Sequence, residues 1–219
     1  MIAFIVPGFG MPTDFENDPT YISVINKVVA HISNYKNSHR DHKILVIFSG
    51  GNSDLDAPYL RTEAEEMHKM FGKLAGDKLS DVVFETEKQS LSSLDNLLYS
   101  QELLGRYSDI EKVIIFVEET RLNRTKVTAE KVFSVPVEIV PLQLYSDEQL
   151  KDIDLMMKKE ELGTKYSLWA LQSLENLVKS REQYAQKFKL LRGVEPSQRE
   201  AALKQWWKDM LAQAESTPI

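Results

Sequence analysis

DVVFETEKQSLSSLDNLLYSQELL, residues 81–104, passes from a short apolar run to a helical pattern within a few positions. Val82 to Phe84 predict a strand, and leucines at helical spacing predict a helix from Leu94 to Leu104. A strand followed so closely by a helix is typical of a βα unit, from which sheets of parallel strands are built.

The same alternation extends over residues 1–145. We predict five strands, Ile2–Val6, Lys43–Phe48, Val82–Phe84, Lys112–Val117 and Val137–Val140, and between them four helices, Tyr21–Tyr35, Thr62–Leu74, Leu94–Leu104 and Thr125–Phe133. The strands are almost continuously apolar, as expected where helices cover both faces of a sheet. The sequence therefore predicts a three-layer, Rossmann-like α/β domain with a mostly parallel five-stranded sheet.

Residues 146–219 change to a purely helical pattern, with breaks predicted at Gly163 and at Arg192–Pro196. We predict a C-terminal helical extension of three helices, the long middle one carrying an apolar stripe from Leu168 to Leu191. Amphipathic helices normally pack on the rest of the chain, so we expect Trp206 and Leu211 of the last helix to be buried. The alternative is a homodimer surface or a lid.

Composition excludes several classes of function. Hydrophobic residues make up 42% of the chain and charged residues 27%, as in an average globular protein, and no apolar run is long enough for a membrane span. A net charge of −6 argues against binding to nucleic acid, which needs a basic face. There is no cysteine for a disulfide, a thiol nucleophile or a zinc site. The chain starts without a basic leader, so we expect a cytoplasmic protein.

Small and polar residues follow the predicted strands, and right-handed crossovers would bring all of them to one edge of the sheet. Glycine-containing loops come after the first two strands, with Gly8 and Gly10 in one and Ser49, Gly50, Gly51 and Asn52 in the other. The backbone N–H groups of such loops can hold a phosphate or a carboxylate. A tight turn without a ligand explains each loop equally well.

A second group of polar residues follows the third strand at three-residue intervals: Glu87, Ser90, Ser93 and Asn96. This spacing can direct the four side chains toward one ligand. Helix capping is the alternative, because Ser92 or Ser93 could serve as the N-cap residue.

Two arginines, Arg121 and Arg124, follow the fourth strand near the start of the next predicted helix. Cations at this end oppose the helix dipole, so their placement indicates an anion site, unless Glu118 and Glu119 neutralise them.

Familiar catalytic and cofactor motifs are absent from the sequence. There is no GxxxxGK[ST] motif, and Thr13 stands where a dinucleotide fingerprint needs its third glycine. The four histidines lie within predicted helices or before the second strand, so we do not expect a Ser-His-Asp hydrolase. Asp54 and Asp56 are two acids in one loop, which are more often solvated than bound to a metal, so we do not predict a metal site. The sequence identifies no cofactor.

The order of these motifs resembles the YdcF-like family, which includes the SanA and ElyC type envelope proteins and whose domain is of largely unknown function. The resemblance covers residues 1–145 and rests on Pro7-Gly8-Phe9-Gly10, Ser49-Gly50-Gly51, Thr62-Glu63-Ala64, the series from Glu87 to Asn96, and Arg121-Leu122-Asn123-Arg124-Thr125. Ser93 replaces the family's usual threonine, and Arg121 stands where the family generally has histidine. Because arginine cannot shuttle protons at neutral pH, a family reaction that used this histidine would be lost or reduced to binding.

Taken together, these features predict one crevice at the carboxyl edge of the sheet for an anionic or nucleotide-like small molecule. In the enzyme hypothesis, Glu63 or Glu87 acts as general acid or base, while the glycine loops and the arginines hold the anion. The rival hypotheses are a binding module without turnover, for which the resemblance suggests an adenosyl-type ligand, and a scaffold that associates through its helical extension. We expect six residues to converge on the crevice: Gly8, Ser49, Gly50, Glu87, Ser90 and Arg124.

Overall fold

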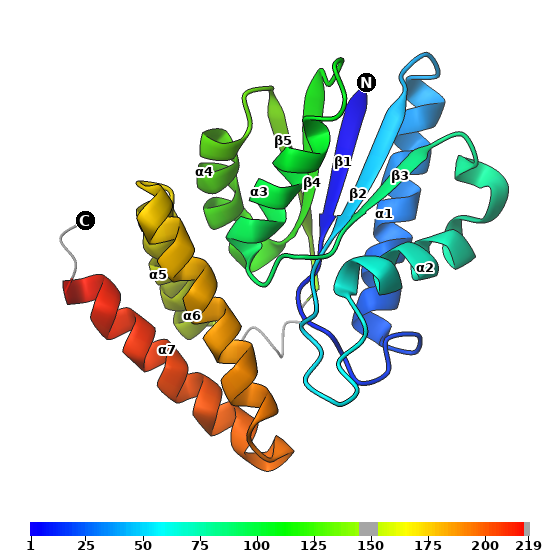
Figure 1. The fold of residues 1–219 in the computed structure, drawn as a ribbon. Helices are drawn as coiled ribbons and strands as arrows, with labels where there is room; N and C mark the ends of the chain where they lie inside the picture. Colours follow the sequence, from blue (N-terminus) through cyan, green and yellow to red (C-terminus); the bar gives the residue numbers. More distant parts are fainter. Residues whose placement is uncertain (145–152, 217–219) are drawn as a thin grey trace.

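A computed structural model describes residues 1–144 and 153–216, with side chains up to residue 144 and from 157 to 210. Five strands form one sheet in the order β3-β2-β1-β4-β5, and every pair is parallel (Figure 1). The strands are β1 Ile2–Pro7, β2 Ile44–Ser49, β3 Val83–Glu87, β4 Lys112–Glu118 and β5 Val137–Leu142. The predicted α/β fold is therefore confirmed, and the sheet is parallel throughout.

Four helices cover the two faces of this sheet: α1 Pro19–Ser38 and α2 Glu63–Ala75 on one face, α3 Ser93–Leu104 and α4 Leu122–Val132 on the other. Successive residues of β1 and β2 point into opposite layers, so both strands are buried and apolar almost throughout. Two short 3-10 helices, η1 Gly76–Leu79 and η2 Glu119–Arg121, complete this part of the chain.

Side-chain caps fix where three of these helices begin. Asp18, Thr62 and Ser92 each accept a hydrogen bond from the backbone N–H three residues further on. In contrast, α4 has Arg121 at its N-cap position and no capping side chain. It begins at Leu122, three residues earlier than predicted, directly after η2.

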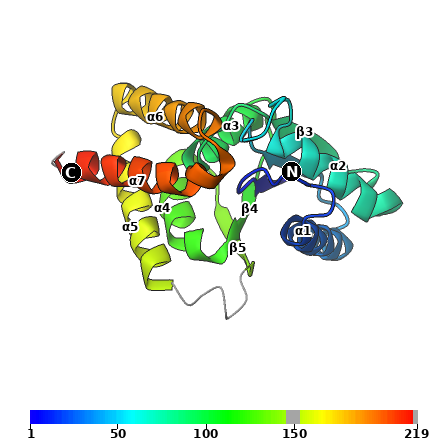
Figure 2. The ribbon, with the colours of Figure 1, turned by 90° about the horizontal axis from the view of Figure 1, so that it is seen from below.

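The extension contains the three predicted helices, α5 Ile153–Ala170, α6 Leu174–Arg192 and α7 Arg199–Ser216, with a short 3-10 helix, η4 Pro196–Gln198, before the last. They lie beside α4 and the carboxyl edge of the sheet (Figures 1 and 2). The predicted boundary at residues 145 and 146 lies outside the described residues.

The predicted break at Gly163 is wrong, because this glycine lies inside α5. A Cβ at Gly163 would stand 2.7 Å from Nη1 of Arg124, so glycine allows α5 to pass close to that arginine. The helix instead ends at Ala170, and Ser173 caps α6 by accepting from the N–H of Asn176. The stripe predicted for one long helix is thus divided between two helices.

Aromatic side chains hold the extension together. Tyr166, Trp206 and Met210 are buried against one another, and four further apolar side chains pack on them, Trp169, Tyr184, Leu203 and Trp207. Burial of Trp206 was predicted; the side chain of Leu211 lies outside the described residues. Within the described ranges, no helix combines the length and apolar character needed to cross a membrane.

Candidate functional site

Buried hydrogen bonds join the carboxyl ends of β2 and β3 to the start of α3. Glu87 accepts from Ser49 Oγ at 2.6 Å, and from the backbone N–H groups of Gln89 at 2.5 Å and Ser90 at 2.9 Å. Ser90 Oγ in turn donates to Asn96 Oδ1 at 2.5 Å. Glu87 therefore joins β2 to the turn between β3 and α3, with one hydrogen bond from the strand and two from the turn.

The same turn is also capped, because Ser92 is the N-cap residue of α3 and accepts from the N–H of Asp95. Helix capping and a directed polar cluster were alternative interpretations of this segment. The structure contains the cap at Ser92, while Ser90 and Asn96 bond to each other beside it.

The glycine loop after β2 is bonded to this turn. Gly50 N–H donates to the carbonyl of Glu87 at 3.0 Å, and Gly51 N–H donates to the carbonyl of Ser90 at 2.8 Å. The two amide groups proposed to hold an anion thus have protein acceptors in this structure.

Gly51→Ala is expected to lower the free energy of unfolding by about 1–3 kcal/mol, the usual cost of overpacking. A Cβ at Gly51 would lie 2.3 Å from the Ser90 carbonyl oxygen, a backbone atom that cannot rotate away. Urea unfolding measures the change. Gly72→Ala is the matched control, because nothing lies within 4 Å of its Cβ position and alanine favours the helix. Equal stability of the two variants would contradict this account of the loop.

Glu63, at the start of α2, is the carboxylate that lies between the first two loops. Its Oε2 accepts from the N–H of Gly10 at 2.8 Å, and its Oε1 accepts from Ser53 Oγ at 2.5 Å. The Tyr21 hydroxyl is 3.2 Å from Oε2. Burial, together with the nearby Glu63 carboxylate, holds the pKa of Tyr21 well above its usual range.

Close packing around Glu63 explains the glycine at position 8. A Cβ on Gly8 would lie 2.0 Å from Glu63 Oε2, and one on Gly50 would lie 2.6 Å from Glu63 Cβ. The carboxyl edge of β1 and β2 is therefore shaped around this glutamate.

The two candidate arginines have different partners. Arg121 Nε lies 3.2 Å from Glu118 Oε2, so the predicted alternative of a neighbouring glutamate holds for this residue. Arg124 is buried, and its Nε lies 3.0 Å from Oε2 of Glu160 in the extension. Its Nη2 also donates to Ser93 Oγ at 3.3 Å.

The ion pair of Arg124 and Glu160 is poorly hydrogen-bonded. Neither Arg124 Nε nor Glu160 Oε2 has a hydrogen bond of acceptable geometry, and the remaining contact from Nη2 to Oε1 is long, at 3.4 Å. Burial lowers the pKa of Arg124 and raises that of Glu160, in each case against the charged form. The pair thus joins α4 to α5 at some electrostatic cost.

A crevice of about 590 Å³ lies between the carboxyl edge and the extension. Eight predicted site residues line it: Gly8, Gly10, Glu63, Ser90, Ser93, Asn96, Arg121 and Arg124. Five others are not among its lining residues: Ser49, Gly50, Gly51, Asn52 and Glu87. Of the six residues expected to converge, Gly8, Ser90 and Arg124 line the crevice, while the other three support it through the hydrogen bonds described above.

The extension supplies the opposite wall, which the motifs of residues 1–145 did not indicate. Tyr184, Lys187, Phe188 and Leu191 of α6 line the crevice, together with Leu203 and Trp207 of α7. The four residues of α6 have the spacing i, i+3, i+4 and i+7, so they share one helix face. A lysine within this otherwise apolar set is the sequence signal that was missed.

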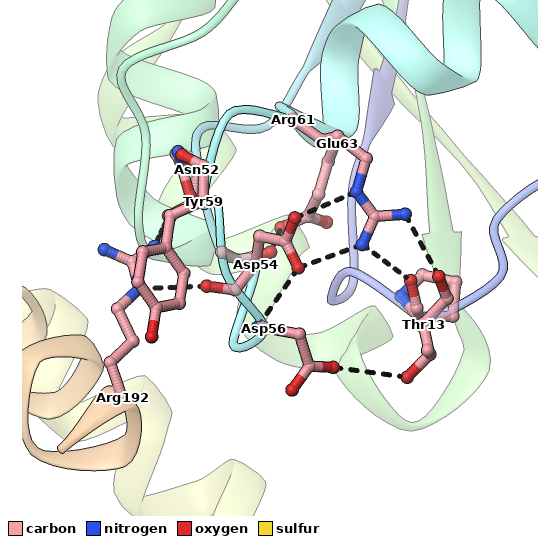
Figure 3. Close-up of polar contacts among 10 residues, drawn as sticks. Thr13, Asn52, Asp54, Asp56, Tyr59, Arg61, Glu63 and Arg192 are labelled. Carbon is pink, nitrogen blue, oxygen red and sulfur yellow. Dashed lines mark hydrogen bonds and ion pairs between the residues drawn. The ribbon is translucent and has the colours of Figure 1, made fainter.

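Two arginines of the extension hold the loop between β2 and α2. Arg192 donates to the Asn52 carbonyl at 2.9 Å and to its Oδ1 at 2.6 Å, and Arg199 Nη1 lies 2.9 Å from Asp56 Oδ1. Figure 3 shows Arg192 beside this loop. Asn52 was predicted to contact a ligand, but here its side chain contacts the extension.

Asp54 in the same loop forms a two-point ion pair with Arg61, from Nε at 2.8 Å and from Nη2 at 2.9 Å (Figure 3). Burial alone would raise the pKa of Asp54, but the hydrogen bonds from Arg61 and the Asp56 N–H, together with the nearby positive charges, outweigh burial and lower this pKa. The described residues contain no cluster of three or more His, Asp or Glu side chains suited to a metal ion.

Comparisons with protein-family models, with curated proteins and with solved structures found no match to this chain.

Proposed function

We propose that this protein binds an anionic, nucleotide-like small molecule in the crevice between the carboxyl edge and the extension. The observation that carries the proposal is the combination of cations and aromatic rings around one cavity, with Arg121 on one wall and Lys187 on the other. Within the described residues, no carboxylate pairs with Lys187. Phe9, Tyr184 and Trp207 line the same space and offer flat surfaces for a base or another planar group.

The position of the crevice supports the same proposal. Ligands of open α/β sheets bind outside the carboxyl ends of the strands, next to helix N-termini that favour anions. Here Ser93, the first residue of α3, lines the crevice. A volume of about 590 Å³ falls within the range of small-molecule sites.

Catalysis is the second candidate function, and Glu63 is the observation that favours it. This carboxylate lines the crevice, whereas Glu87 is buried in the supporting network. In an enzyme, Glu63 would be the general acid or base, and the donors from Gly10 and Ser53 would orient it. Binding without turnover would leave Glu63 in a structural role.

Three further expectations remain predictions. The motif order in residues 1–145 leads us to propose a YdcF-like domain, with Arg121 at the position of the family histidine. A cytoplasmic location and a homodimer through the extension are also proposals, and sedimentation tests the second of these.

A thermal-shift screen of inorganic phosphate and nucleotides tests the proposed function. A ligand present at 100 times its Kd should stabilise the folded protein by about 2.7 kcal/mol. Arg121→Ala is expected to weaken binding of the best ligand about ten- to a hundredfold, as measured by calorimetry, because it removes a charge-assisted contact. Folding should change little, since Thr120 still donates two hydrogen bonds to Glu118.

Arg106→Ala is the matched control, because Arg106 is exposed and lies beyond the far end of α3. This variant should bind as the unchanged protein does. The proposal fails if neither phosphate nor any nucleotide shifts the unfolding midpoint, or if Arg121→Ala binds as tightly as Arg106→Ala.

A further inference from the structure

Lys187 is the only lysine that α6 contributes to the lining of the crevice, and its surroundings are apolar and aromatic. Its ammonium group lies 4.2 Å from the ring centroid of Phe188, 5.2 Å from that of Tyr184 and 5.6 Å from that of Trp206. Among the described residues it has neither a hydrogen-bond acceptor nor an ion-pair partner. Lysines on the outer face of the same helix differ, since Lys189 is exposed to solvent.

Burial and the nearest carboxylate act in opposite directions on the protonation of Lys187. Burial is the largest influence and lowers the pKa of Lys187 to about 8. Among the neighbouring charges, Glu63 of α2 has the larger effect and raises this pKa, whereas Arg121 on the opposite wall lowers it. Tyr184 is the titratable ring beside it on α6, and on the α5 side Arg124 and Glu160 pair with each other.

We propose that Lys187 is a nucleophilic amine that forms an imine with the carbonyl group of an anionic aldehyde or ketone bound in the crevice. This inference rests on the proposed function, because the anionic group of the ligand would be held on the wall that carries Arg121. A desolvated lysine near another cation is the arrangement that activates amines for this reaction. Lys187 supplies the amine and Arg121 selects for negative charge.

The reaction balances without an oxidant or a reductant. The nitrogen lone pair of Lys187 adds to the carbonyl carbon, so that a C–N bond forms and the oxygen takes up a proton. The carbinolamine then loses its oxygen as water, and a C=N bond replaces the C=O bond. The two hydrogens of the amine leave with that oxygen.

Reductive trapping with pyridoxal 5′-phosphate tests this proposal, because the probe carries both an aldehyde and a phosphate. The full-length protein is treated with limiting probe and then with borohydride, and the modified lysine is located by mass spectrometry of its peptides. We expect Lys187 to be labelled at least about tenfold faster than Lys189 at neutral pH, because burial lowers the pKa of the Lys187 amine to about 8. Its labelling rate should rise through pH 8 as the amine loses its proton.

Lys187→Arg should abolish the fast label, and Lys189→Arg should leave it unchanged. Because peptides of the unchanged protein already locate the adduct, the test does not depend on the folding of either variant. Labelling of Lys187 no faster than Lys189 would overturn the proposal.

Two comparisons distinguish failure of this inference from failure of the proposed function. If phosphate stabilises the protein but Lys187 is not labelled selectively, the amine proposal is wrong and the anion site stands. If Lys187 is labelled equally fast by pyridoxal without its phosphate, and inorganic phosphate does not compete, the reactive amine is supported and the anion site is contradicted.

Discussion

Arg124→Ala is expected to lower the free energy of unfolding by about 3 kcal/mol, near the lower end of the range for broken buried ion pairs. Arg124 is buried beneath α5, where a Cβ at Gly163 would lie 2.7 Å from its Nη1. Its removal would leave the half-buried Glu160 carboxylate without a cation and would open a cavity. Urea unfolding at neutral pH, with the extension intact, measures this loss.

The effect of Arg124→Ala should also depend on pH. Burial raises the pKa of Glu160, so the folded variant binds this proton more tightly than the unfolded chain does. The folded variant is therefore more stable at pH values below the ordinary glutamate pKa. This added stability is lost as the pH rises through the raised pKa of Glu160. The difference from the unchanged protein should shrink at low pH.

A double replacement is the control for this prediction. Changing both Arg124 and Glu160 to leucine removes the buried charges together and should recover most of the lost stability. If Arg124→Ala is as stable as the unchanged protein but loses ligand affinity, Arg124 serves a bound anion and the ion-pair account is wrong.

Glu87→Ala is expected to lower the free energy of unfolding by about 3 kcal/mol or more, because each buried donor left without an acceptor destabilises the fold by about 1–3 kcal/mol. The donors are Ser49 Oγ and the N–H groups of Gln89 and Ser90. Their loss would separate the ends of β2 and β3 from the start of α3. The free energy of unfolding in urea is again the measurement.

Glu85→Ala is the matched control on the same strand, where the carboxylate is half-buried and accepts one hydrogen bond, from Tyr107 at 2.9 Å. Glu85→Ala should lower the free energy of unfolding much less than Glu87→Ala does. The effect of Glu87→Gln should lie between these two. A fully stable Glu87→Ala variant with impaired ligand turnover would instead return Glu87 to the catalytic role predicted from sequence.

The α/β domain could be predicted because its signals are local. Strands such as Ile2–Pro7 are apolar at almost every position, and the helix starts at Thr62 and Ser92 carry cap residues. In the extension, Gly163 has the local signal of a break but serves close packing against Arg124. That contact joins residues far apart in the sequence, so no local pattern reveals it.

Placement of the site could be predicted in outline, since parallel βα units bring their loops to one edge. The roles of individual residues could not. Whether the N–H of Gly51 faces a ligand or the Ser90 carbonyl depends on how two loops meet, and the sequence of neither loop specifies this. Lys187 was missed because its wall of the crevice belongs to the extension, outside the motifs.

The most direct test of the central claim is electron density for a bound ligand in crystals soaked with the nucleotide that stabilises the protein most. We predict its phosphate in the crevice, within about 3 Å of Arg121 or Lys187 nitrogen atoms, as for charge-assisted hydrogen bonds. The planar part of the ligand should lie against the aromatic wall of α6 and α7. Density for the nucleotide at another site, with the crevice empty at saturating concentration, would contradict the account.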